Sequence, residues 1–175
     1  MLVYSSILAF LVYRAAGLYK PGAGLRILDG TLRRVMTSSV SILSMISMAL
    51  IMEHAGMTQT LAEGLAQATG ALFPLVSPWI GAIGAFMTGS NTSSNVVFTK
   101  LQMHTAELLG YSLPVILAAQ TAGAGLASVT APAKVVVGAS TAGMAGKEGD
   151  VMRRVAAYTA LLVLLISLLT FLGVQ

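Results

Sequence analysis

The segment 155–173 contains no charged residue and consists largely of Leu, Val, Ile and Ala. As a helix it is long enough to cross a hydrocarbon core about 30 Å thick, so it predicts a transmembrane helix. The segment 35–52 is also uncharged and nearly as long. Since 56% of the chain is hydrophobic and only 9% is charged, too little polar surface remains to cover a water-soluble domain. We therefore expect an all-α membrane protein with a single transmembrane domain.

The segments between the apolar stretches differ in charge. The segment 14–34 carries several Lys and Arg residues and one acid, Asp29, so the positive-inside rule predicts a cytoplasmic loop. The segment 53–70 has no Lys or Arg and is expected to be an external loop, which makes 35–52 a span that runs outward. The segment 147–154 is again basic and predicts a second cytoplasmic loop. This pattern indicates a multi-pass protein of the cell (inner) membrane.

Two shorter elements are expected near the first span. The segment 1–13 is apolar but too short to cross a bilayer before Arg14 arrives, so we expect a truncated helix of a protein that continues upstream. Thr60-Leu61-Ala62-Glu63 has the form of a capping box, which predicts the start of a short surface helix that ends at Gly70.

The segment 71–109 is apolar but is divided by the polar run 89–95, which is unsuited to contact with lipid. Pro74 and Pro78 interrupt its first part. We expect a re-entrant helical hairpin that enters from the outside, turns at the polar run and leaves near Gly110. Two full spans would give the same topology on charge counting, so that alternative stays open.

The segment 112–146 contains a second break, at 128–132. Pro132 suits the first turn of a new helix, with Thr130 or its neighbour as the cap. The two apolar stretches around the break would together form one discontinuous crossing of the membrane. A kinked but continuous packing helix is the alternative.

Each break would expose a helix N-terminus inside the membrane, where unpaired N–H groups and the helix dipole favour a carboxylate. Short hydroxyl and amide side chains at the breaks could bind a small hydroxy acid without adding a fixed charge. A cation within the second half-helix could pair with the substrate. The alternatives are that the polar tip only caps a hairpin, and that the cation forms a structural ion pair or snorkels. The predicted substrate-binding residues are Ser90, Asn91, Thr92, Asn95, Thr130 and Lys134.

Coupling to a cation gradient is expected along the helix that follows the tip. Lys100, His104 and Glu107 are spaced by four and three residues and share one helical face. A titratable His and Glu there suit a proton path, although plain surface exposure is the alternative. With Ser94 at the tip, His104 and Glu107 are the predicted ion-coupling residues, and the coupling ion is H⁺ or Na⁺. Neither a cofactor nor a metal site is expected.

Four motifs then suggest a family. They are Gly89-Ser90-Asn91-Thr92-x-Ser94-Asn95, Gln120-x-x-Gly123, Val136-Val137-x-Ala139-Ser140-x-x-x-Gly143 and Gly146-Lys147-Glu148-Gly149. In this order they resemble the C-terminal region of L-lactate permeases, over about half of the chain. The resemblance implies a partial, C-terminal repeat of a larger transporter whose N-terminal half, with a second hairpin, would be a partner. The Ser-Asn-Thr tip also resembles that of other ion-transporter-superfamily carriers, which implies contacts with carboxylate and cation at Ser90, Asn91 and Thr92.

The predicted function is symport of lactate or a related small hydroxy-monocarboxylate, with the lipid bilayer as the chain's surroundings. A non-transporting fragment or scaffold subunit, and a carrier for di- or tricarboxylates, are the alternatives. We do not expect an enzyme, because the one candidate nucleophile, Ser140, would have to use His54 or His104 as base, and neither has an evident orienting acid. Nucleic acid is not an expected partner, because the basic residues lie scattered between apolar spans.

Overall fold

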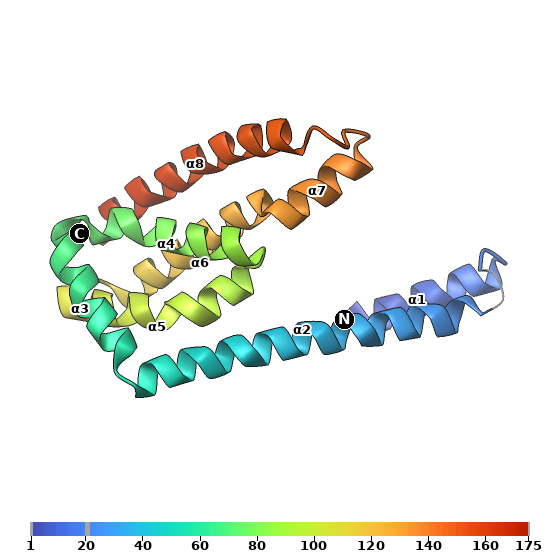
Figure 1. Ribbon diagram of the computed structural model, residues 1–175, viewed down its shortest axis with the longest axis horizontal. Helices are drawn as coiled ribbons and strands as arrows, with labels where there is room; N and C mark the ends of the chain where they lie inside the picture. Colours follow the sequence, from blue (N-terminus) through green and yellow to red (C-terminus); the bar gives the residue numbers. More distant parts are fainter. Residues whose placement is uncertain (1, 20–21, 175) are drawn as a thin grey trace. The chain divides into compact units, whose positions relative to one another are not determined.

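The computed structural model describes residues 2–19 and 22–174, and this part of the chain is helical without any strand (Figure 1). Residues 1, 20, 21 and 175 of the expected segments lie outside it. The all-α class is confirmed. The helices are α1 (Leu2–Ala15), α2 (Ala23–His54), α3 (Met57–Thr69), η1 (Gly70–Leu72), α4 (Phe73–Thr88), α5 (Asn91–Leu109), α6 (Leu113–Ala127), η2 (Ser128–Thr130), α7 (Pro132–Thr141) and α8 (Glu148–Gly173).

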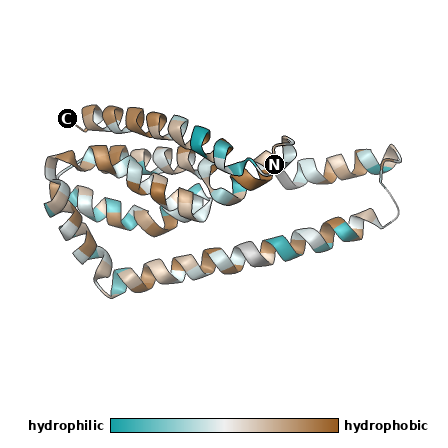
Figure 2. Cartoon of the chain, turned by 45° about the horizontal axis from the view of Figure 1, so that its top comes forward, coloured by the Kyte–Doolittle hydropathy of each residue, from teal (hydrophilic) through white to brown (hydrophobic). Residues whose placement is uncertain are grey.

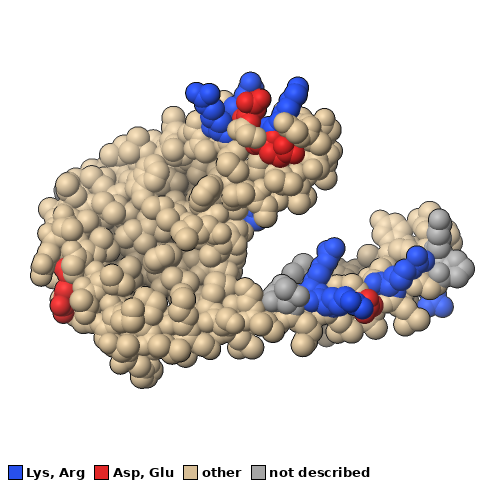
Figure 3. Space-filling view, in the orientation of Figure 1, with Lys and Arg blue, Asp and Glu red and all other residues tan. Residues whose placement is uncertain are grey.

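Four helical stretches are long and apolar enough to cross a membrane: Ala23–His54, Met57–Thr88, Leu113–Thr130 and Glu148–Gly173. Figure 2 shows that α8 is hydrophilic where it begins and hydrophobic toward its C-terminal end. Figure 3 shows charged side chains gathered in one place where α8 begins, in agreement with the charged residues of 147–154. The chain is an integral membrane protein by this composition.

The helices extend further than the sequence predicted. The expected loop 14–34 is helical from Ala23 onward, and Arg33 and Asp29 form an i,i+4 ion pair of 3.0 Å on it. The expected loop 147–154 is helical from Glu148, an acid in the first turn that suits the helix dipole. Charge marks the side of the membrane and does not by itself end a helix, so these loop assignments were wrong, while the sides they face stay predictions.

The expected external loop 53–70 contains the helix α3, as predicted, but it begins earlier. Gly56 is the N-cap, and the Thr60 hydroxyl donates to the Gly56 carbonyl oxygen over 3.1 Å. The capping box assigned to Thr60 and Glu63 is therefore wrong. Gly70 ends the helix as expected, with a positive φ of 47° that favours glycine.

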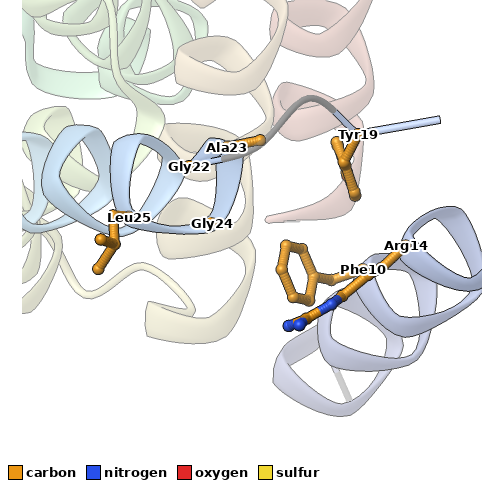
Figure 4. Close-up of a pocket in the computed structure, with 7 residues that line it drawn as sticks. All are labelled: Phe10, Arg14, Tyr19, Gly22, Ala23, Gly24 and Leu25. Atoms are coloured by element: carbon orange, nitrogen blue, oxygen red, sulfur yellow. The ribbon is translucent and has the colours of Figure 1, made fainter. Parts of the chain in front are cut away.

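The chain divides into two units, Met1–Leu43 and Ser44–Gln175, which are described separately. In the first unit, Phe10 and Tyr19 have ring centroids 5.3 Å apart, and Gly24 packs against the Phe10 ring. These residues and Arg14 line a cavity of about 350 Å³, which Figure 4 shows between α1 and the start of α2.

In the second unit, α4 packs against α6 through glycine. A Cβ added at Gly81 would overlap the Gln120 carbonyl oxygen, and one added at Gly123 would overlap the Pro78 carbonyl oxygen. The two backbones therefore touch directly. Apolar clusters lie on both sides of this contact and fix the hairpin between α3, α6 and α8. Their buried members are Phe73, Ala106 and Ile116 in one cluster, and Ala82, Ala127 and Val163 in the other.

The segment 71–109 is a helical hairpin of α4 and α5, and the helix expected over 112–146 is discontinuous. After α6 the chain forms the 3₁₀ turn η2, and Ala131 then takes an extended ψ of 134° before α7 begins at Pro132. The Thr130 hydroxyl donates to the Ala127 carbonyl oxygen over 2.6 Å, so Thr130 closes α6 and does not cap α7. Its neighbour Ala131 holds the N-cap position.

Candidate functional site

The hairpin tip is a tight connection of two residues. Gly89 ends α4 in the left-handed conformation, with φ 71°, and Ser90 is the extended N-cap of α5. The Ser90 hydroxyl oxygen accepts the Ser93 N–H over 3.2 Å. Thr88, which the sequence analysis did not single out, accepts the Ser90 N–H with its hydroxyl oxygen over 3.3 Å. Ser90 therefore has the capping role that was the alternative to direct substrate binding.

The tip lies beside the break between α6 and α7, as Figure 1 also shows for the end of α4. A Cβ built on Gly89 would be 3.5 Å from the Ala131 Cβ, and one on Gly125 would be 3.7 Å from Asn91 Nδ2. The N-termini of α5 and α7 thus lie close together. Two helix starts at one place concentrate N–H donors and the positive ends of two dipoles.

The predicted binding residues differ in how they face this place. Asn91 is half-buried and its Oδ1 is buried without a hydrogen-bond partner among the described residues. Thr92 is exposed, and Thr130 is buried. Lys134 is exposed on α7, and its Nζ donates to the Ser128 hydroxyl oxygen over 3.3 Å, so its charge lies at the break.

Asn95 is half-buried and is held between two helices. Its Nδ2 donates to the Thr121 hydroxyl oxygen over 3.2 Å, and its Oδ1 accepts from Gln120 Nε2 over 3.5 Å. Together with Thr92, Thr99 and other residues it lines a groove of about 510 Å³ between α5 and the last turns of α2.

Of the three predicted ion-coupling residues, His104 and Glu107 lie side by side, and Ser94 lies apart from them. Ser94 is fully buried, and its hydroxyl donates to the Gly81 carbonyl oxygen over 2.8 Å, which ties α5 to α4. His104 lies about three helical turns beyond Ser94 on α5. Its Nδ1 is 3.4 Å from a carboxylate oxygen of Glu107. Lys100, expected on the same face as these two, pairs with Glu53 over 3.0 Å.

A buried polar network at the centre of the hairpin was missed by the sequence analysis. Gln102 and Gln120 are fully buried, and Gln102 Nε2 donates to Gln120 Oε1 over 2.6 Å. A signal existed for Gln120, because it is an amide in the largely apolar α6, whereas Gln102 lies among other polar residues of α5. Gln120 was noted only as part of a family motif, since the sequence alone does not pair residues on different helices.

Similarity to known proteins gives the family of the chain. A family model described as L-lactate permease matches residues 3–175. The chain belongs to the L-lactate permease family. It is 32% identical over 151 residues to the L-lactate permease of Salmonella typhi, covering 86% of this chain and 27% of that protein. No solved structure matches it.

Two further proteins are similarly related to this chain. The glycolate permease GlcA of Escherichia coli is 33% identical over 149 residues, covering 85% of this chain and 26% of GlcA. The L-lactate permease of Bacillus subtilis is 34% identical over 142 residues, covering 81% of this chain and 25% of that protein. The chain thus spans about a quarter of the length of these relatives. All three are named permeases, in agreement with the prediction of a transport protein and not an enzyme.

Proposed function

We propose that this chain is part of a secondary transporter that carries lactate, glycolate or a related small hydroxy-monocarboxylate across the cytoplasmic membrane, by symport with H⁺ or Na⁺. The observation that carries the proposal is the meeting of two interrupted helices, with Gly89 beside Ala131. The family and the names of the relatives, lactate and glycolate permeases, support the substrate class.

The chemistry of the meeting point suits a small anion. The N-termini of α5 and α7 offer N–H donors, and the Lys134 ammonium adds a positive charge near them. Asn91 and Asn95 supply amides that can bind both the carboxylate and the adjacent hydroxyl of a hydroxy acid. The carbonyl groups at the C-terminal ends of α4 and α6 are acceptors of the kind that suits a coupling cation.

A re-entrant position of the hairpin belongs to this proposal. The stretch Met57–Thr88, which contains α4, is apolar enough to enter a bilayer, whereas α5 is not one of the four candidate spans found in the described residues. A polar α5 that returns to the outside through protein contacts agrees better with this difference than a second lipid-facing span. A further part of the transporter would then supply the second hairpin expected from the resemblance.

Depth can be tested by single-cysteine labelling, because the sequence contains no cysteine. A cysteine in place of Thr92 should react slowly with a membrane-impermeant maleimide, and lactate should slow it further. A cysteine in place of Gln59, on the exposed surface of α3, should react fast and without regard to lactate. Equal fast labelling of both positions in every condition would contradict a tip that lies within the membrane.

The transport activity is tested by uptake of radiolabelled L-lactate and glycolate in cells that express the complete gene. A strain from which the gene is deleted is the control. We expect uptake that falls when the proton or the sodium gradient is collapsed. Equal accumulation in both strains would support the non-transporting alternative. Uptake of citrate or succinate in preference to lactate would support the carrier for larger acids.

Asn91→Ala tests the site within the same assay. It removes an amide that lies against Gly125 at the break, so we expect uptake to fall at least about tenfold while the amount in the membrane stays unchanged. Gln59→Ala, which truncates an exposed amide on α3, is the matched control and should keep full uptake. Full uptake by the Asn91 variant would refute the site.

A further inference from the structure

A line of buried amides connects the middle of α5 to the hairpin tip. Gln102 Nε2 donates to the Ser77 carbonyl oxygen over 2.8 Å and to Gln120 Oε1 over 2.6 Å. Gln120 Nε2 then faces the Ser94 hydroxyl oxygen at 3.3 Å and Asn95 Oδ1 at 3.5 Å. Since an amide has a donor end and an acceptor end, each member of this line sets the orientation of the next.

The first fixed point is the backbone of α4. The Ser77 carbonyl oxygen can only accept, so Gln102 must turn its NH₂ group toward it. The same NH₂ group reaches Gln120, which must therefore present its oxygen to Gln102. The NH₂ group of Gln120 is then directed to the tip.

The second fixed point is Ser94, and it requires the same orientation. Its single hydroxyl hydrogen is donated to the Gly81 carbonyl oxygen over 2.8 Å, so its oxygen can only accept from Gln120. Both ends of the line thus give Gln120 one orientation. The orientation leaves Gln102 Oε1 buried without a partner among the described residues, which is unfavourable for the fold.

The consequence for Asn95 is a fixed amide. Its oxygen faces Gln120, so its NH₂ group points away from the buried amides, and one N–H is used by the Thr121 hydroxyl oxygen at 3.2 Å. The second N–H remains for a ligand in the groove that Asn95 lines with Thr92 and Thr99. Lys100 neutralises the one carboxylate of the described lining of this groove, Glu53, over 3.0 Å. An amide turned the other way would direct its oxygen there and repel an anion.

We propose that Gln120, itself held by Gln102, is a positioning residue that keeps the NH₂ group of Asn95 directed at the carboxylate of the substrate. This inference rests on the proposed function, because it assigns the role of a residue at that binding site. It predicts that Gln120 acts through Asn95 and not through the stability of the fold alone.

A double-mutant cycle in the uptake assay separates these roles. Gln120→Met keeps a similar volume but removes the donor and the acceptor. We expect it to raise the KM for lactate about tenfold with Vmax within about twofold. Asn95→Ala should raise KM by a similar factor. The double variant should have the KM of Asn95→Ala alone, because Gln120 has nothing left to orient.

Gln102→Met is the second variant, and it carries the test if Gln120→Met does not reach the membrane. Since Ser94 still orients Gln120, we expect a smaller KM increase, about threefold, which also disappears in the Asn95→Ala background. The melting temperature of each detergent-solubilised variant reports any loss of stability separately.

Two results would overturn the positioning role: an unchanged KM in folded Gln120→Met, or a full additional effect of Gln120→Met in the Asn95→Ala background. A wild-type protein that takes up neither lactate nor glycolate would instead refute the proposed function, so the two failures are distinguishable.

Discussion

The contact between α4 and α6 yields a prediction about Gly123. A methyl group at this position would overlap the Pro78 carbonyl oxygen and lie 2.8 Å from its carbonyl carbon, against 3.4–4 Å for ordinary contact. Because the obstacle is backbone and not the end of a flexible side chain, the helices must separate. Overpacking costs about 1–3 kcal/mol, and we expect the upper end here. The better helix propensity of alanine returns about 1 kcal/mol, so Gly123→Ala should destabilise the protein by about 2 kcal/mol.

The assay is the thermal stability of the detergent-solubilised protein, followed by size-exclusion chromatography after heating. A loss of about 2 kcal/mol corresponds to a fall in melting temperature of about 4–8 °C for a chain of this size. Gly64→Ala is the matched control, because a Cβ there on α3 has nothing within 4 Å, and its melting temperature should stay equal or rise. Equal melting temperatures for the two variants would refute the close contact.

Three further predictions concern charges and the hairpin. Lys134→Gln should raise the KM for lactate about tenfold with normal insertion, because it removes the positive charge at the break; an unchanged KM would exclude a role in anion binding. A double-mutant cycle of Glu53→Gln and Lys100→Gln on melting temperature should give a coupling below about 1 kcal/mol, since these side chains are 31% and 50% exposed; a larger coupling would mean that the pair is shielded from water. Ser94→Ala should lower stability by about 1–2 kcal/mol, because the Gly81 carbonyl oxygen loses a buried donor; a melting temperature equal to that of the wild type would contradict this role.

The breaks in the helices could be predicted from the sequence because their causes are local. Gly89 can take a positive φ and Pro132 cannot continue a preceding helix, and both act within one turn. The loops at 14–34 and 147–154 were wrong where helices begin at Ala23 and Glu148, because basic residues are compatible with helix and report only the side of the membrane.

The candidate site was predictable only in part. The tip and the break were each visible, but that Gly89 lies against Ala131 depends on the packing of four helices. The pairing of Gln102 with Gln120 joins residues far apart in sequence, which no spacing rule within one helix can indicate. Ser94 was expected to serve an ion, whereas its contacts in the structure are with Gly81 and Gln120.

The backbone contact at Gly81 and Gly123 also limits how the molecule can change shape. Helices that slide past each other need side chains that can exchange rotamers at the interface. At Gly81 and Gly123, α4 and α6 instead meet through backbone atoms, which cannot adjust in this way. They are therefore expected to travel as one rigid body. Any rearrangement that exposes the tip to the opposite side of the membrane must then be absorbed elsewhere, and the extended residue Ala131, where the helix is interrupted between η2 and α7, is a point at which the backbone can bend.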